Sequence, residues 1–178
     1  ILNMGASIFN LSDDQICWYA TIPTTGLVLN HGTSVINSTA NNSNVAFFGG
    51  GLTYYDLNFK GIGTSASATL LDNNHFHNVS FLSKAFINQS NTFQKLTFHA
   101  DGTIKSNSIY NNLNFAAGHT YTLWSGTTHT INNNWQIQGT CTSYIILQTN
   151  NGGNSATISK NAGAVLGYNI HIKDMKCI

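Results

Sequence analysis

Glutamate and arginine are both absent from this chain of 178 residues. All six acidic residues are aspartates and all seven basic residues are lysines, so charged side chains make up 7 % of the composition. The two missing residue types are good helix formers, whereas the abundant Asn, Thr, Ser and Gly suit strands and turns. This composition argues against long helices and favours an all-β fold.

Other scarcities limit the classes of partner. The net charge is +1 and the lysines form no cluster. This argues against nucleic acid binding, because the affinity of proteins for nucleic acids is mainly electrostatic. No apolar run approaches about 18 residues, so the sequence predicts no membrane-spanning segment. The only proline, Pro23, lies in the least regular part of the chain, where it need not interrupt a stacked ladder of strands.

The three cysteines, Cys17, Cys141 and Cys177, show no CxxC spacing. They allow one disulfide, from Cys177 to either of the others, or none. If Cys141 and Cys177 lay in one column two coils apart, they would be about 9 to 10 Å apart, beyond disulfide reach. Because the first residues, Ile1–Met4, lack the features of a signal peptide, we expect a segment of a longer protein.

One six-residue pattern recurs along the middle of the chain. It reads aromatic, polar, polar, aliphatic, polar, aromatic in Phe76–Phe81, Phe93–Phe98 and Tyr110–Phe115, whose starts are 17 residues apart. A looser copy, Tyr54–Phe59, lies 22 residues upstream. This period is too short for a helical hairpin and fits one coil of a β-solenoid.

The sequence therefore predicts one right-handed parallel β-helix, a single stack over residues 1–178. We expect residues 1–50 to form irregular coils or a cap and residues 51–178 to form regular coils, with polar loops at 37–44 and 150–154. The last aliphatic and the last aromatic residue of each repeat should point inward and stack on their counterparts in two columns: Val79, Leu96 and Leu113, and Phe81, Phe98 and Phe115.

Candidate catalytic or metal-binding groups are few. Asp13 and Asp14 form the one tight acidic pair, which would suit a metal or acid–base site, or a solvated or helix-capping turn. His75 and His77 lie two apart on one strand face, as a metal pair or a surface pair without metal. No nucleophile elbow occurs. We predict no catalytic residue, no bound metal and no cofactor.

Exposed aromatic side chains would be the best sign of glycan binding, because sugars stack on aromatic rings. The candidates are six aromatic residues: Trp18, Trp124, Trp135, Tyr54, Tyr55 and Tyr121. The alternative is that these rings are stacked in the core. A row of aromatic side chains on one outer face would favour the first reading.

The second half of the chain resembles a known kind of repeat. Ser155–Lys160, followed by Tyr168–Asp174, together with Gly139–Thr142 and the aromatic-x-Asn-Leu-x-Phe strands, is similar to repeat regions of very large Bacteroidetes surface proteins. Those proteins resemble gliding-motility adhesins and other cargo of the type IX secretion system. The resemblance implies a β-helix that is secreted to the cell surface and handled by that machinery.

Three functions are compatible with these features of the sequence. The first is a non-enzymatic stalk or adhesive segment, in which length grows by repetition because each coil needs only its neighbours. The second is a carbohydrate-active or glycan-binding β-helix of the polysaccharide-lyase kind, which would need acids and aromatics to converge in one cleft. The third is a tailspike-like β-helix, which would form trimers.

Overall fold

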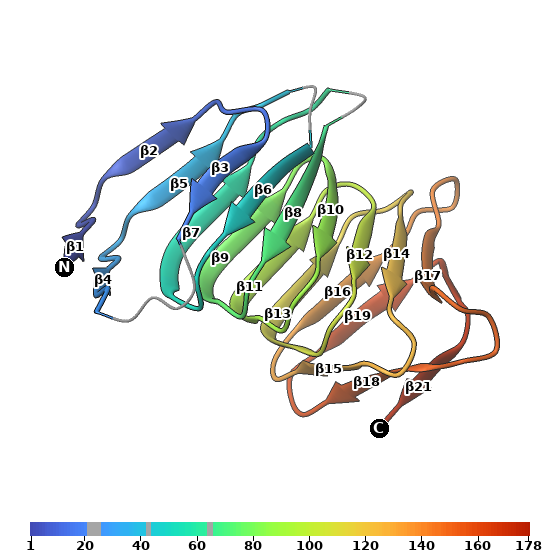
Figure 1. Cartoon of the computed structure of the whole chain (residues 1–178). Coiled ribbons are helices and arrows are strands. Elements are labelled where there is room, and N and C mark those ends of the chain that lie inside the picture. The colour runs from blue at the N-terminus through green and yellow to red at the C-terminus, as the bar shows by residue number, and fades with distance from the viewer. Residues whose placement is uncertain (21–25, 42–43, 64–65) are drawn as a thin grey trace.

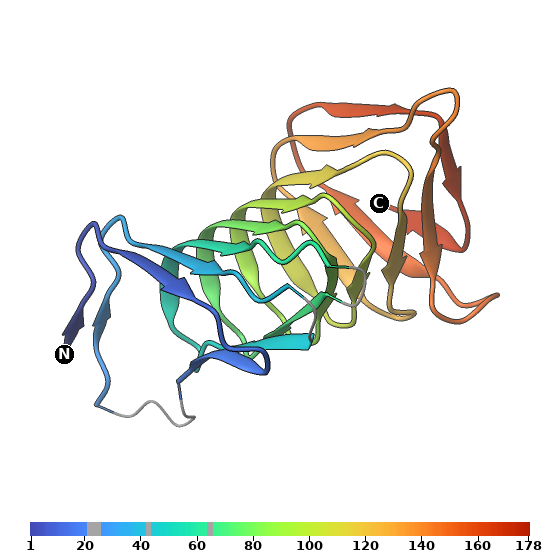
Figure 2. The same ribbon diagram turned by 90° about the horizontal axis from the view of Figure 1, so that it is seen from above.

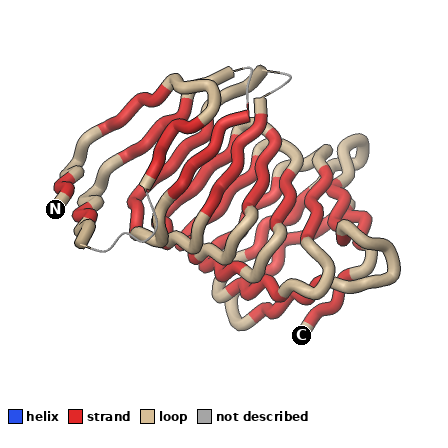
Figure 3. Tube along the Cα trace, in the orientation of Figure 1, coloured by secondary structure: helices blue, strands red, loops and turns tan. Residues whose placement is uncertain are grey.

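The strands wind into coils that advance along one axis from the N-terminus to the C-terminus (Figure 1). The structure is a computed structural model and describes residues 1–20, 26–41, 44–63 and 66–178. Figure 3 shows strands joined by loops, with no helix in these ranges, so they hold no helix that could cross a membrane. Pro23 lies outside the described residues.

One wall of the stack is a long sheet in which every strand pair is parallel. Its strands, in spatial order, are β2 (Ile8–Leu11), β5 (Val35–Ser38), β7 (Thr53–Phe59), β9 (His75–Phe81), β11 (Thr92–Phe98), β13 (Ser108–Phe115), β15 (Thr128–Ile131), β18 (Ala156–Lys160) and β21 (Met175–Cys177). Two further strands, β16 (Trp135–Gln138) and β19 (Val165–Tyr168), extend it from β13.

The opposite wall is a second parallel sheet, which receives one strand from each coil. Its strands are β3 (Ile16–Tyr19), β6 (Asn44–Phe48), β8 (Ser67–Leu71), β10 (Lys84–Ile87), β12 (Gly102–Ile104), β14 (Thr120–Leu123), β17 (Ile145–Thr149) and β20 (Ile170–Ile172). A separate short pair joins β1 (Leu2–Asn3) to β4 (Leu29–Asn30). Figure 2 shows the coils in line from this end to the C-terminus, which confirms the single stack.

Both predicted inward columns are confirmed. Leu96 pairs with Val79 on one side and with Leu113 on the other, and Phe98 lies in the same way between Phe81 and Phe115. All six side chains are buried. The ring centroid of Phe98 lies 5.3 Å from that of Phe81 and 5.6 Å from that of Phe115. The repeat of 17 residues is therefore one full coil.

The first aromatic residue of each repeat forms a third buried column, which the sequence analysis did not predict. Tyr54, Phe76, Phe93 and Tyr110 stack in succession with centroids 5.5, 5.7 and 5.6 Å apart. The two polar residues that follow each of these aromatics both point outward. Two consecutive outward positions bend the strand, so one long strand lines two walls of the coil.

The bend opens into a loop in the later coils. Strand β13 pairs with β15 through residues 108–110 and with β16 through residues 113–115. Residues 132–134, which are three asparagines, lie between these two shorter strands. A chain of asparagine side chains at this corner contacts the coils on either side. Asn133 Nδ2 donates to Asn112 Oδ1 at 3.3 Å, and Asn161 Nδ2 donates to Asn132 Oδ1 at 2.8 Å.

The predicted polar loop at 37–44 is wrong at both ends. Asn37 and Ser38 belong to strand β5 and are buried, and Asn44 begins strand β6, while residues 42–43 lie outside the described part. Asn37 Nδ2 donates to Asn10 Oδ1 at 2.8 Å, and Asn58 Nδ2 donates to Asn37 Oδ1 at 3.1 Å. This amide ladder between three coils gives hydrogen-bond partners to asparagine side chains that the sequence alone would place in solvent.

The early coils join the same two sheets. Strand β5 continues the long sheet into β7, and β6 continues the opposite sheet into β8.

All three cysteines are free, with Cys17 buried and Cys141 and Cys177 exposed. Burial raises the pKa of the Cys17 thiol to about 11, which keeps it protonated near neutral pH.

Candidate functional site

The three predicted tryptophans lie on different elements and do not form one row. Trp18 in β3 is half-buried, stacks on Phe47 at 6.1 Å and donates its indole N–H to Tyr54 Oη at 3.0 Å. Trp124 follows β14 and is 40 % exposed, with Lys105 Nζ 5.5 Å from its ring centroid. Trp135 is only 7 % exposed, and Tyr54 and Tyr121 are each 1 % exposed. These three rings are therefore not available to a surface ligand, which corrects the expectation that they could bind a glycan.

The acidic pair serves a turn. Asp13 Oδ1 accepts backbone N–H bonds from Gln15 at 2.8 Å and Ile16 at 3.0 Å, and these bonds lower the pKa of the carboxyl. The side chain thereby closes the turn that leads into β3. Asp14 beside it is exposed.

The other aspartates are spread over different coils. Asp72 accepts the backbone N–H of Gly50 at 2.8 Å, and Asp101 accepts that of Thr120 at 2.9 Å. Asp56 lies within β7, and Asp174 lies between β20 and β21. The described residues contain no group of three or more His, Cys, Asp or Glu side chains placed to hold a metal ion.

His75 and His77 lie on the outer face of β9, on either side of the buried Phe76. His77 stacks on Tyr55 with centroids 4.2 Å apart, and its Nδ1 is 3.2 Å from Asp56 Oδ1. His31 in turn lies 6.1 Å from Tyr55 with its ring nearly parallel. The structure thus contains an outer stack of three rings, His31, Tyr55 and His77, over three coils.

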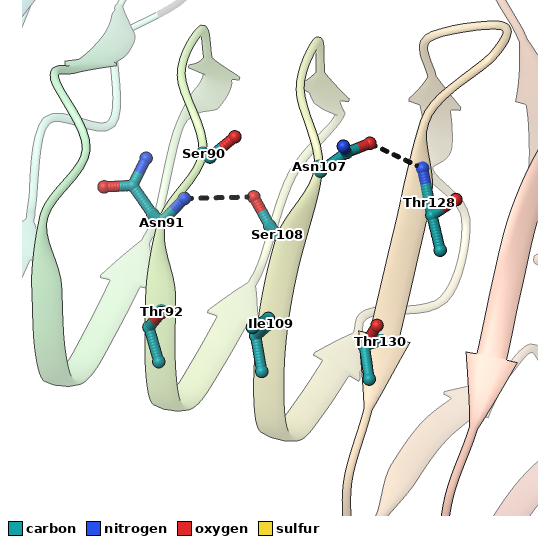
Figure 4. A pocket seen from close by; sticks show the side chains of 8 residues that line it. All are labelled: Ser90, Asn91, Thr92, Asn107, Ser108, Ile109, Thr128 and Thr130. Atoms are coloured by element: carbon teal, nitrogen blue, oxygen red, sulfur yellow. Dashed lines mark hydrogen bonds between the residues drawn. The ribbon is translucent and has the colours of Figure 1, made fainter.

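Two adjoining hollows lie on this outer face and share Thr92. We call them together the outer groove. The first, shown in Figure 4, has a volume of about 300 Å³ and is lined by Ser90, Asn91, Thr92, Asn107, Ser108, Ile109, Thr128 and Thr130. The second has a volume of about 260 Å³ and is lined by His31, Thr53, Tyr54, Tyr55, His75, Phe76, His77, Thr92 and Gln94.

One column of side chains in register forms the groove. Thr53 pairs with His75, His75 with Thr92, Thr92 with Ile109, and Ile109 with Thr130. The first four point outward directly before a member of the first aromatic column. Thr130 stands in the same way before Ile131, which pairs with Tyr110. Figure 4 shows Thr92, Ile109 and Thr130 side by side on β11, β13 and β15.

Polar atoms along the groove fall into two groups. Some hold the coils together: Asn107 Oδ1 accepts the backbone N–H of Thr128 at 2.8 Å, and Ser108 Oγ accepts that of Asn91 at 3.4 Å (Figure 4). The hydroxyls of Thr92 and Thr130 form no hydrogen bond with any part of the chain that the structure describes. These hydroxyls are open to a ligand.

The outer groove contains no lysine or aspartate side chain. A neighbouring hollow of about 370 Å³, farther along the same strands, differs in this respect because it is lined by Asp56, Lys95 and His99 among other residues. Asp56 and Lys95 therefore lie beside the outer groove and do not line it. The sequence analysis missed the groove, although its threonines share one position in the repeat.

His129 is a buried titratable group that belongs to the core. It pairs with Ser108 and not with Tyr110, but its ring lies nearly parallel to that of Tyr110, with centroids 6.2 Å apart, and it is 1 % exposed. Its Nδ1 lies 3.1 Å from Tyr110 Oη and its Nε2 lies 2.8 Å from Thr127 Oγ1. A neutral imidazole can use both contacts, since each hydroxyl can donate or accept. Burial lowers the pKa of His129 to about 4.

This burial should make the stability of the chain depend on pH. Between about pH 6.5 and pH 4 the unfolded chain binds a proton at His129 and the folded chain does not. The free energy of unfolding should therefore fall as the pH falls through this window, by about 3 kcal/mol in total. Denaturant unfolding at a series of pH values measures it. The variant His129→Phe should lose this part of the slope, and an unchanged slope would contradict the assignment.

Comparisons of the chain with protein-family models, with curated proteins and with solved structures find no match.

Proposed function

We propose that this chain is a non-enzymatic structural and adhesive segment of a secreted bacterial cell-surface protein. The observation that carries the proposal is the unbroken parallel ladder of the long sheet, from β2 to β21, with its inward columns in register. Each coil is held by its two neighbours, so such a stack can extend a binding surface away from the cell as a stiff body.

The placement of the acidic side chains supports the non-enzymatic part of the proposal. Hydrolysis of a glycoside usually requires two carboxyl groups on opposite sides of one bond. Here Asp13, Asp72 and Asp101 accept backbone hydrogen bonds at three separate turns. Each carboxylate is thus engaged in holding its own turn or joining two coils.

The export part rests on the resemblance of Ser155–Lys160 and Tyr168–Asp174 to repeats of Bacteroidetes surface proteins. In the structure these segments fall in β18 and around β19 and β20, in the last coils of the stack. We propose accordingly that the secretion machinery is of the type IX kind and that the segment lies outside the outer membrane.

Two measurements test the two parts of this function. An antibody raised against the chain should label intact source cells as strongly as permeabilised ones, while a cytoplasmic marker is labelled only after permeabilisation. In limited proteolysis of the purified chain, the first cuts should fall in exposed loops such as residues 150–154 and spare residues 75–115, where the ladder is continuous.

Either part can fail by itself. Labelling only after permeabilisation would reject the surface location. Early cuts distributed over β9, β11 and β13 would reject a stiff segment.

A further inference from the structure

We propose that the outer groove binds an uncharged glycan chain that lies along the axis of the stack. The register column from Thr53 through His75, Thr92 and Ile109 to Thr130 crosses five consecutive strands. At about 4.8 Å per strand, the four steps give a contact line about 19 Å long. This length and straightness suit an extended polymer better than a compact small molecule.

The chemistry of the groove matches the hydroxyl groups of a sugar. Thr92 and Thr130 offer hydroxyls that are unpaired within the described residues, and each can donate or accept one more bond. Asn107 uses its side-chain oxygen on Thr128 and retains an amide NH₂ group as a donor. Ile109, 44 % exposed in the middle of the column, provides an apolar surface for the C–H groups of a sugar ring.

The aromatic end of the groove adds a wall of rings. His31, Tyr55 and His77 stack on one another along the axis, and all three line the second hollow. His75 stands in the threonine column beside them. A sugar chain that lies along the column would contact these rings on one side and the threonine hydroxyls beneath it.

The lack of basic side chains in the groove argues against a polyanionic ligand. Nucleic acids and acidic polysaccharides draw most of their affinity from Lys and Arg side chains, and the lining of the outer groove contains none. Lys95, which follows the groove residue Gln94 in β11, lines the neighbouring hollow together with Asp56.

The pairing of the backbone in this sheet argues against a peptide ligand that binds as an added strand. Peptides that add to sheets bind at an exposed edge, where main-chain N–H and C=O groups are free. The groove lies instead on the face of the long sheet, whose strands β7, β9, β11 and β13 are paired on both sides. Side-chain hydroxyls and amides are the groups that this face can offer, and these fit sugars.

The test uses the full chain and six linear, neutral oligosaccharides: the hexaoses of the cellulose, xylan, mannan, laminarin, chitin and maltose series. Oligogalacturonate of the same length serves as the charged probe. Titration calorimetry or a glycan array measures the affinities. We expect saturable binding of at least one neutral series and no binding of oligogalacturonate.

Matched variants locate the site. Removing both open hydroxyls with Thr92→Val and Thr130→Val should weaken binding by about tenfold or more, since each variant removes one hydrogen bond to the sugar. Thr97→Val, on the same strand as Thr92 but in the charged hollow, should leave the affinity within about twofold. Circular dichroism confirms that each variant is folded.

Three results would overturn the inference: no binding of any neutral series, preference for oligogalacturonate, or equal losses in the groove and control variants. Because extracellular polymers are met only by an exported segment, the choice of a glycan rests on the proposed function. The two fail separately, since surface labelling without sugar binding rejects only the groove, and sugar binding by a cytoplasmic protein rejects only the location.

Discussion

Replacing Phe98 by alanine should lower the free energy of unfolding by about 3–5 kcal/mol, the range for removing a fully buried phenylalanine. Phe98 is 1 % exposed and lies between Phe81 and Phe115 in the middle of its column. It also meets Tyr121 edge-on at 5.7 Å. The variant therefore leaves a cavity that the coils above and below cannot fill without breaking their register.

Denaturant unfolding followed by circular dichroism measures this effect. The matched control is Thr97→Ala, one residue earlier in the same strand but pointing outward. It should change the free energy of unfolding by no more than about 0.5 kcal/mol. Equal effects of the two substitutions would show that Phe98 is not part of a packed column.

The second large effect is expected at a polar residue. Asn74 is 1 % exposed and lies at the corner between β8 and β9. Its Nδ2 donates to the carbonyl oxygens of Leu71 at 2.7 Å and Asp72 at 3.1 Å, and its Oδ1 accepts the N–H of Gly51 at 3.1 Å. These bonds hold Asp72 in a left-handed conformation, with φ of 70°.

Asn74→Ala should therefore cost about 2–4 kcal/mol, because three hydrogen bonds are lost and buried backbone groups are left without partners. Asn73→Ala is the control, since Asn73 belongs to the same turn and is exposed. Its substitution should have an effect near zero. Thermal and denaturant unfolding of both variants decide the matter, and a neutral Asn74→Ala would contradict the structural role of this corner.

Regular alternation explains why part of the fold could be predicted from the sequence. Within Val79–Phe81, Leu96–Phe98 and Leu113–Phe115 the strand keeps a period of two, so the inward residues follow from the residue types alone. Equal spacing of 17 residues then fixes which side chains stack.

The same period of two fails at the bend in each long strand. His77 and Asn78 both point outward, which breaks the alternation and hides the burial of Phe76. Asn78 lies within β9, and its Nδ2 donates to Asp56 Oδ1 at 2.8 Å.

Most of the outer groove could have been predicted, because Thr53, His75, Thr92 and Ile109 each directly precede the first aromatic residue of a repeat, whereas the place of Thr130 could not. Thr92 follows His75 by one repeat, but the insertion of residues before β15 displaces Thr130 from that spacing. The burial of His129 was hidden in the same way, since it pairs with Ser108 across the same irregular spacing. Only the pairing of the strands shows which residues become neighbours.

Equal coil length also has a consequence for how the gene can change. Residues 92–108 make one complete turn, and the aromatic and aliphatic residues before and after it have the same chemical character. An unequal crossover that deletes this turn in frame would seat Tyr110 on Phe76 and Leu113 on Val79, with no shift of phase. The opposite event would add a turn. The length of the segment can thus be altered by recombination in whole steps, without any point mutation to repair the joint.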